Sequence, residues 1–390
     1  MNSEAMQPPY TDLHTPCYFY DMDLLRETLS RIESHTSPNG YKVHYALKAN
    51  SNDRLLRTIS QAGFGADCVS GNEIQKALET GFAPADIVFA GVGKADWEID
   101  LALDHDIGSF NCESLPEIQV IAERAARKNK KARIALRINP GIDAKTHHYI
   151  TTGIEENKFG INSEDLPQVL QACRELDAIE LKGLHVHIGS QITDMDVFKS
   201  LCLRVNELQE YFRREHIPLE HINVGGGLGV NYEEPQDEPI PDFDSYFNTF
   251  GEFLHPEPWQ QLHFELGRAV TGQCGKLITR VLYVKEGIHT RFAVVDAGMT
   301  ELIRPALYHA YHKITSPTSQ RPEKKYDVVG PICESSDYFG KAIDLPELSR
   351  GDVLVIHTAG AYGEVMRSFY NLRDHLKFYY SDDMSRKHKI

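Results

Sequence analysis

The sequence of 390 residues is poor in the features that mark metal sites and disulfide frameworks. Its seven cysteines are odd in number and scattered, so we expect reduced thiols and a cytoplasmic protein. Its 18 histidines include the pairs at 147–148 and 309–312, but neither pair has an acidic residue at a convincing spacing. We therefore expect packed or solvated histidines and no bound metal.

Long apolar runs and basic blocks are also missing. Residues 1–10 are polar and give no apolar signal segment, and no later run could span a bilayer, so we expect no membrane association. The formal net charge is −15, and no basic block offers a phosphate-binding face. These absences exclude a nucleic-acid-binding protein and leave a globular protein of ordinary composition, with 41% hydrophobic and 25% charged residues.

What the sequence does contain is a repeated strand-then-helix pattern. Eight short apolar segments follow one another from Lys42, separated mainly by helical stretches, and this number of units is what a (β/α)8 barrel requires. A doubly wound open sheet is the alternative, but its glycine-rich turn should follow the first strand, whereas here the glycine cluster follows the seventh. The predicted barrel strands are 42–47, 65–69, 86–90, 107–111, 133–138, 183–188, 222–224 and 262–264.

After about Gly275 the pattern changes to strands with turns and few helices between them, which indicates a separate mainly β domain. A further strand at 15–20 has no place in a complete eight-stranded barrel, so we assign it to the β domain. The fold prediction is an α/β protein with a (β/α)8 barrel over 36–275 and a mainly β domain formed by 1–35 and 276–390. The predicted strands of the β domain are 277–285, 291–295, 325–329 and 353–356.

Polar residues gather at the carboxyl ends of the barrel strands, where the active site of such a barrel lies. Lys48 ends the first strand. Its amine either pairs with a carboxylate or, when desolvated, forms a covalent bond with a carbonyl cofactor. The other polar residues at these ends are Asp67, Arg137, Asn139, His185, His187, Ser190, Glu265 and Arg268.

Several of these residues suit one cofactor. The glycine run at 225–227 either presents N–H groups to a phosphate or is a flexible turn. Glu265 could keep a pyridine nitrogen protonated and Arg268 could bind a substrate carboxylate, unless the two simply pair with each other. His187 could stack on a flat ring, while His185 could be a satisfied core histidine. Together with Lys48, which would hold an aldehyde, this set indicates pyridoxal phosphate.

The second domain adds three polar segments. Cys333 and Glu334 share a predicted turn, where the thiol could donate a proton and the carboxylate could bind an ammonium group; a small buried cysteine is the alternative. Arg304 and Tyr308 form a candidate clamp for a carboxylate. Tyr362 offers a hydroxyl group on a tight turn.

At this point the chain resembles the pyridoxal-phosphate-dependent basic amino-acid decarboxylases of the alanine-racemase-like fold. The resemblance runs from about Pro16 to Tyr370, and within the family the motifs are most similar to the branch that decarboxylates meso-diaminopimelate to lysine and CO2. One departure is Leu266, where the family usually has proline, which leaves an N–H group and a freer φ at this turn. The motifs are 45–50 (YALKAN), 187–191 (HIGSQ), 225–227 (GGG), 265–268 (ELGR), 333–335 (CES) and 360–363 (GAYG).

The resemblance implies how the cofactor is held. Lys48 would bind its aldehyde, His187 would stack on its ring, and Glu265 would pair with its ring nitrogen. Asp67 and Glu73 would lie near Lys48 and help to set its charge. The residues expected around the phosphate are Ser190, Gly226, Gly227 and Tyr362.

The resemblance also implies how an amino-acid substrate is bound. Cys333 would be the proton donor and would reach the site from the other subunit of a head-to-tail homodimer. Glu334 would bind the distal ammonium group, Tyr362 would border the substrate, and the segment 157–160 would close over the site. The residues expected at the distal carboxylate are Arg268, Arg304 and Tyr308.

Two alternative functions remain open. A decarboxylase of the same fold could act on arginine, ornithine or carboxynorspermidine. A diamine product site needs only an acid, so Arg304, Tyr308 and the glutamate at 334 in place of aspartate favour diaminopimelate. A non-catalytic relative that binds a partner protein is the second alternative, and the presence of Lys48 and Cys333 argues against it.

Overall fold

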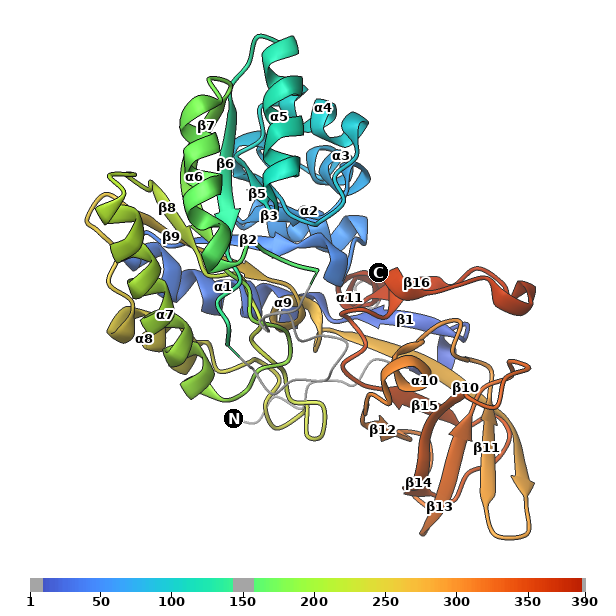
Figure 1. The fold of residues 1–390 in the computed structure, drawn as a ribbon. Helices are drawn as coiled ribbons and strands as arrows, with labels where there is room; N and C mark the ends of the chain where they lie inside the picture. The colour runs from blue at the N-terminus through green and yellow to red at the C-terminus, as the bar shows by residue number, and fades with distance from the viewer. Residues whose placement is uncertain (1–9, 143–157, 388–390) are drawn as a thin grey trace. The chain divides into compact units, whose positions relative to one another are not determined.

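A computed structural model describes residues 10–142 and 158–387 of the chain. The chain forms two compact units, a barrel unit and a β unit (Figure 1). The barrel unit comprises 28–229 and 241–270, and the β unit comprises the described residues up to Glu27, Val230–Ile240 and the chain from Thr271 onward. This division differs from a barrel over 36–275 by a few residues at each end and by the segment Val230–Ile240.

The barrel unit contains eight parallel strands that close into a ring, which confirms the predicted (β/α)8 architecture. The ring closes between the first and last strands, where Val43 lies opposite Phe264. The strands are β2 (Lys42–Ala46), β3 (Gly65–Cys68), β4 (Ile87–Phe89), β5 (Ser109–Cys112), β6 (Ala132–Arg137), β7 (Ile179–His185), β8 (His221–Asn223) and β9 (Gln261–Leu266).

The helices of the barrel unit lie outside this ring of strands (Figure 1), and local sequence explains where they begin. Ser114 accepts a hydrogen bond from the N–H of Glu117, an N-cap that starts α5. That helix then buries apolar residues three and four positions apart, from Ile118 to Ala125, against the strands. The helices are α1 (Met22–Asn39, shared between the units), α2 (Asp53–Gln61), α3 (Gly71–Glu79), α4 (Asp96–Asp104), α5 (Leu115–Arg127), α6 (Leu166–Glu175), α7 (Met195–Arg214), α8 (Phe243–Phe253) and α9 (Arg268–Thr271).

The β unit is built on a mixed sheet in which β10 is the central strand. The N-terminal strand β1 belongs to this sheet, because it pairs antiparallel with β10 and parallel with β16. The strands are β1 (Cys17–Tyr20), β10 (Gly275–Glu286), β11 (Arg291–Val295), β12 (Ile314–Thr315), β13 (Glu323–Val329), β14 (Tyr338–Pro346), β15 (Val353–Ile356) and β16 (Lys377–Tyr380). Two helices, α10 (Arg304–Tyr308) and α11 (Ser381–Lys387), complete the unit.

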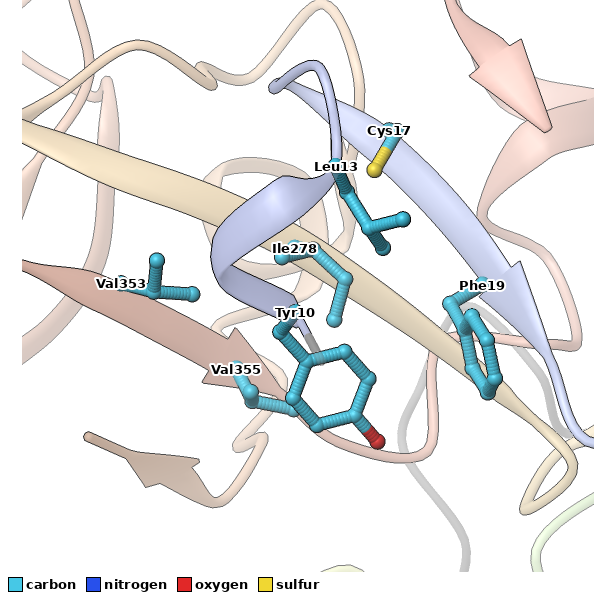
Figure 2. Close-up of a cluster of buried hydrophobic side chains, with 7 residues drawn as sticks. All are labelled: Tyr10, Leu13, Cys17, Phe19, Ile278, Val353 and Val355. Carbon is cyan, nitrogen blue, oxygen red and sulfur yellow. The ribbon is translucent and has the colours of Figure 1, made fainter. Parts of the chain in front are cut away.

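A cluster of apolar side chains covers one face of this sheet (Figure 2). Tyr10 packs edge-to-face on Phe19, with ring centroids 5.4 Å apart. Burial raises the pKa of Cys17 to about 12, so this thiol is a small apolar packing group. The cluster comprises Tyr10, Leu13, Cys17, Phe19, Ile278, Val353 and Val355.

The segment Val230–Ile240 leaves the barrel after β8 and contributes to the β unit. Its Tyr232 hydroxyl accepts a hydrogen bond from Arg304, at 2.8 Å, and Glu234 forms an ion pair with Lys313, at 2.7 Å. These partners lie more than 70 residues later in the chain, so local sequence gives no sign of this excursion.

Three histidines, two of them buried and His221 half-buried, lie near the amino ends of neighbouring barrel strands. His44 of β2 has Nε2 3.2 Å from Nδ1 of His263 in β9. The ring of His263 stacks on that of His221 in β8, with centroids 4.8 Å apart and planes 12° apart. A Cβ atom at Gly183 would lie 2.1 Å from the His221 ring, so glycine is needed at this close approach. Burial lowers the pKa of all three histidines, to about 4 for His44 and His221, so the group packs as neutral rings.

Within the described ranges, no helix combines the length and the apolar character needed to cross a membrane.

Candidate functional site

Lys48 lies one turn beyond the end of β2. The strand stops at Ala46, and Lys48 falls in a 3-10 turn over Leu47–Ala49, so the predicted strand was one residue too long. The Nζ atom of Lys48 lies 3.2 Å from Oδ2 of Asp67 in β3. The Asp67 side chain is fully buried, whereas that of Lys48 is 40% exposed. Lys48 is therefore paired with a carboxylate, one of the two alternatives for its amine. The amine still lies at the edge of the barrel interior, where it is partly exposed.

Two carboxyl groups near Lys48 bind protons more tightly than usual. Burial, reinforced by the charge of Glu265, raises the pKa of Asp67 against the opposing effect of Lys48. Burial also raises the pKa of Glu73, on α3, to about 7, although its Oε2 accepts a 2.7 Å hydrogen bond from the N–H of Val69. Proton uptake here changes the charge beside the lysine within the neutral pH range.

Glu265, in β9, is held by side chains from three other strands. Its Oε1 accepts hydrogen bonds from Nδ2 of Asn111 in β5, at 2.9 Å, and from Nδ2 of Asn223 in β8, at 2.7 Å. Its Oε2 lies 3.0 Å from Nε2 of His185 in β7. All four residues are buried. His185 is thus a partner of the carboxylate, which accounts for its burial.

Glu265 is ionised despite its burial. Desolvation by itself would raise its pKa, but the His185 imidazole and the charge of Lys48 outweigh it and lower the pKa well below the usual value for glutamate. A buried carboxylate whose pKa is held low is what a protonated ring nitrogen requires as a partner.

The glycine turn after β8 lies against the backbone of Glu265 and beside the ring of His187. Burial, together with nearby positive charges, lowers the pKa of His187 well below its usual value, so its ring is neutral. Its Nδ1 accepts a 3.3 Å hydrogen bond from the N–H of Gly226. Gly225 has φ +69°, and a Cβ atom at Gly226 would lie 1.9 Å from the carbonyl oxygen of Glu265. Glycine is therefore required at both positions.

Ser190 and Arg268 are brought together at the same end of the barrel. The Ser190 hydroxyl accepts hydrogen bonds from Nε of Arg268, at 3.3 Å, and from its terminal nitrogen, at 3.1 Å. Gly227, with φ +111°, accepts through its carbonyl a 2.9 Å bond from the N–H of Ile192, which joins the glycine turn to the segment after Ser190. Leu266 is the last residue of β9 and is buried.

The residues of the barrel unit fit pyridoxal phosphate by their chemistry. They offer an accessible amine, an ionised carboxylate, a neutral imidazole and a turn of backbone N–H groups. Among the buried polar atoms that have no hydrogen-bond partner in the described residues, three belong to Lys48's neighbour Asp67 and to the partners of Glu265: Asp67 Oδ1, Asn111 Oδ1 and His185 Nδ1. Buried polar atoms are normally paired, so this interior can take further hydrogen bonds from a bound group or from water.

Asn111 and Asn223 are site residues that the sequence motifs did not indicate. Each is an amide side chain inside an otherwise apolar predicted strand. Because a buried amide needs hydrogen-bond partners, this pattern could have predicted that both side chains bind polar groups inside the barrel. Arg137 and Asn139 were selected and make structural contacts: Arg137 forms a 2.8 Å ion pair with Glu113, and the Asn139 side chain accepts a 3.2 Å bond from the N–H of Gly141.

The segment 157–160 is described from Lys158 onward; Asn157 lies outside the described residues. The N–H of Gly160 donates to Oε2 of Glu113, at 2.9 Å, and the guanidinium of Arg137 lies 4.8 Å from the centroid of the Phe159 ring. The Arg137–Glu113 pair therefore anchors the end of this segment to the barrel.

The substrate-binding candidates Arg304 and Tyr308 begin and end α10 in the β unit. Arg304 is buried and donates to the Tyr232 hydroxyl, at 2.8 Å, and to Nε2 of His312, at 3.1 Å. His309 bonds the hydroxyl of Tyr338 through Nδ1, at 3.0 Å. The histidines at 309 and 312 thus have protein partners, while the pair at 147–148 lies outside the described residues.

Cys333 and Glu334 lie in a surface turn of the β unit. Cys333 is exposed, so the alternative of a small buried cysteine is wrong; the turn places it at the surface, with its N–H donating to Oδ1 of Asn371, at 3.1 Å. Glu334 accepts a 2.9 Å bond from the Tyr370 hydroxyl, which raises the pKa of that tyrosine. Tyr362 is half-buried in the turn at 360–363, with φ +57°.

Comparison with known proteins places these features in a family. Residues 23–272 match the model of the pyridoxal-dependent decarboxylase, pyridoxal binding domain. The diaminopimelate decarboxylase of Bacteroides thetaiotaomicron is 56% identical over 376 residues, covering 96% of this chain and 97% of that protein. The solved structure of the Helicobacter pylori diaminopimelate decarboxylase complexed with L-lysine is similar, with 40% identity, a TM-score of 0.90, and coverage of 96% and 93% of the two chains.

A more distant structure, the arginine decarboxylase of Paramecium bursaria Chlorella virus, has 21% identity and a TM-score of 0.82, covers 94% of this chain and 96% of its own, and shows the shared fold alone. The resemblance inferred from the sequence motifs is confirmed, as is the dependence on pyridoxal that it implied. The chain belongs to the diaminopimelate decarboxylase family of pyridoxal-dependent decarboxylases.

Proposed function

We propose that this chain is a carboxy-lyase that converts meso-diaminopimelate to L-lysine and CO2 with pyridoxal phosphate, as the last step of lysine biosynthesis in the cytoplasm. The observation that carries the proposal is the ionised carboxylate of Glu265, held by three donors and close enough to Lys48 for their charges to interact. The identity of 56% to a diaminopimelate decarboxylase supports the choice of substrate.

The residues of the barrel unit divide the work. When bound, pyridoxal phosphate supplies an acceptor for the electron pair that remains when CO2 leaves. Lys48 provides the amine that holds the aldehyde, and Glu265 keeps negative charge beside the ring nitrogen. The neutral imidazole of His187 offers a flat surface to the ring. The glycine turn and Ser190 would hold the phosphate, and we assign Tyr362 of the β unit to the same group.

Recognition of the substrate requires reading a second amino-acid group at its far end. Arg268, Arg304 and Tyr308 would bind the distal carboxylate, and Glu334 the distal ammonium, because a guanidinium group binds a carboxylate with two parallel hydrogen bonds and a carboxylate attracts an ammonium. A site for a simple diamine product would not need the arginines.

The working form in this proposal is a homodimer in which Cys333 completes the site of the partner. Support comes from the exposed Cys333 turn and its neighbourhood, where the large side chains of Phe369, Tyr370 and Leu372 are also exposed. In this arrangement the thiol of Cys333 carries the proton that is delivered to the former α-carbon.

The dimer can be tested by mixing inactive variants. We expect Cys333→Ala to lower kcat by about 10²- to 10³-fold through loss of the proton donor, whereas Cys173→Ala, at a half-buried cysteine on α6, should have little effect. Co-expression of Cys333→Ala with Lys48→Ala should restore about a quarter of the wild-type activity, because half of randomly assembled dimers contain one intact site. If verified mixed dimers stay inactive, a shared site is excluded.

The function is tested on the wild-type protein. We expect a visible absorbance band after addition of pyridoxal phosphate, and CO2 release from meso-diaminopimelate in preference to arginine, ornithine and carboxynorspermidine. Release from one of the other substrates instead would reassign the chain to a sibling activity. A protein that binds no pyridoxal phosphate would contradict the enzymatic proposal altogether.

A further inference from the structure

Asn223 makes two hydrogen bonds in opposite directions inside the barrel unit. Its Nδ2 donates to Oε1 of Glu265, at 2.7 Å. Its Oδ1 accepts from the N–H of Gly225, the first residue of the glycine turn, at 2.9 Å. Asn223 is buried at the end of β8, so both contacts lie away from solvent and neither is easily replaced by water.

The glycine turn also touches the glutamate through its backbone. The N–H of Glu265 donates to the carbonyl of Gly225, at 2.8 Å, and the N–H of Gly226 donates to the ring of His187. The position of the turn therefore depends on the strand that carries Glu265. Asn223 adds the link to the carboxylate itself.

Asn111 is a useful comparison, because it donates to the carboxylate of Glu265 but does not bond the glycine turn. Its Nδ2 donates to the same Oε1 atom of Glu265, at 2.9 Å, and it is fully buried in β5. Its Oδ1, however, has no hydrogen-bond partner among the described residues. The two asparagines thus share the contact to Glu265, and Asn223 alone of the two bonds the turn.

We propose that Asn223 is a positioning residue that couples the carboxylate serving the cofactor ring nitrogen to the glycine turn serving the phosphate, whereas Asn111 positions the carboxylate. This inference rests on the proposed function, because it assigns these two ends of the site to pyridoxal phosphate. It predicts that the ring end and the phosphate end of the ligand lose affinity together when Asn223 is altered.

The side-chain amide suits this position for a chemical reason. An amide offers a donor and an acceptor at once, without charge, and so can serve a carboxylate on one side and an N–H group on the other. An aspartate would have the same shape, but two carboxylates at this distance cannot both be ionised, so it would need a proton to make the same contact.

The experiment compares two ligands on two variants. Pyridoxal phosphate and pyridoxal, which lacks the phosphate, are titrated into cofactor-free full-length protein carrying Asn223→Leu or Asn111→Leu. Both variants should bind pyridoxal phosphate about 10- to 100-fold more weakly, because each loses a hydrogen bond to a charged group. The dissociation constant of pyridoxal divided by that of pyridoxal phosphate reports how much the phosphate contributes to binding. This ratio should fall about tenfold in Asn223→Leu and stay unchanged in Asn111→Leu.

A variant of unchanged shape guards against misfolding. Asn223→Asp should bind pyridoxal phosphate nearly as well as wild type at low pH, where the new carboxyl is protonated, and progressively more weakly as the pH rises. Without cofactor, its free energy of unfolding relative to wild type should also fall as the pH rises, since the folded state holds that proton more tightly than the unfolded chain. The charged and titratable groups that interact with Glu265 are His44, Lys48, Asp67, His185, His187, Tyr246 and His263.

The outcomes separate the inference from the proposed function. An unchanged ligand ratio in Asn223→Leu, or a pH-independent Asn223→Asp, overturns the coupling even if wild type is an active decarboxylase. Wild type that binds neither ligand overturns the proposed function, whereas the unfolding measurements on Asn223→Asp still test whether the two carboxyl groups interact.

Discussion

Replacement of Lys48 by alanine is expected to lower the rate of decarboxylation on the order of 10⁴-fold or more and to abolish the visible absorbance of the bound cofactor. The reason is that Nζ of Lys48, in the 3-10 turn after β2, is the amine proposed to hold the aldehyde, and the neighbouring Asp67 is a carboxylate that cannot replace it. Absorbance spectra and CO2 release from meso-diaminopimelate, measured on the same preparations, check both parts.

Lys48→Arg separates the chemistry from the charge. A guanidinium keeps a positive charge beside Asp67, but it stays protonated at neutral pH and is not a nucleophile. We expect this variant to fold, to bind the cofactor without the absorbance of the lysine-bound form, and to be nearly as inactive as the alanine variant. Lys182→Ala, which removes a surface lysine paired with Glu220, should be fully active. Activity of Lys48→Arg within tenfold of wild type would exclude a covalent role for the lysine.

The free energy of unfolding of the barrel should carry a large acid-sensitive contribution from His44, His221 and His263. Burial lowers the pKa of these rings, to about 4 for His44 and His221, whereas an exposed histidine in the unfolded chain titrates near about 6.5. His44 and His221 each therefore contribute stability that is present above about pH 6.5 and is lost as the pH falls toward about 4, by roughly 1.4 kcal/mol per pH unit, and the contribution of His263 has the same sign.

The readout for this prediction is a difference between variants, because burial raises the pKa of Glu73 to about 7 and this shift acts in the opposite direction. His221→Phe keeps a flat ring against His263 and removes one titrating group. The free energy of unfolding of the cofactor-free protein is measured with urea at several pH values between 7 and 4. Its change per pH unit should be smaller in His221→Phe than in wild type, by the equivalent of about one proton. His105→Phe, at an exposed position, is the matched control and should leave the slope unchanged. An equal slope in His221→Phe and wild type would contradict the prediction.

The strand-and-helix pattern was enough to predict the barrel, because each strand is a short apolar run that must be buried on both faces. The same logic placed Lys48, Glu265 and Arg268 at one end, since strand ends in a barrel converge. It misplaced the end of β2 by one residue, because Leu47 is buried and apolar and still belongs to the following 3-10 turn. The strand predicted at 183–188 is wrong by more, since β7 is Ile179–His185, and Val186 and Ile188 are buried and apolar although they lie beyond its end.

The parts that escaped prediction depend on partners far away in the chain. Asn111 and Asn223 lie within short strands, and both donate hydrogen bonds to Glu265, which follows them by 154 and 42 residues in the chain. The excursion of Val230–Ile240 depends on contacts such as that between Tyr232 and Arg304. Strand β14 was not predicted. It contains Ala342 at φ +53°, and its pairing with β13 has register shifts, so its residues do not alternate regularly between the two faces of the sheet.

The pairing of β1 with β16 also sets a condition on the synthesis of this protein. Cys17 lies opposite Lys377, so β1 must wait after its synthesis for a partner made about 360 residues later. At the usual 5–20 residues per second this takes roughly 20–70 s, during which the aromatic stretch Tyr18–Tyr20 lacks its final neighbours. Chains that terminate before Lys377 would keep this strand edge open, and we expect them to be the forms that chaperones bind and proteases remove.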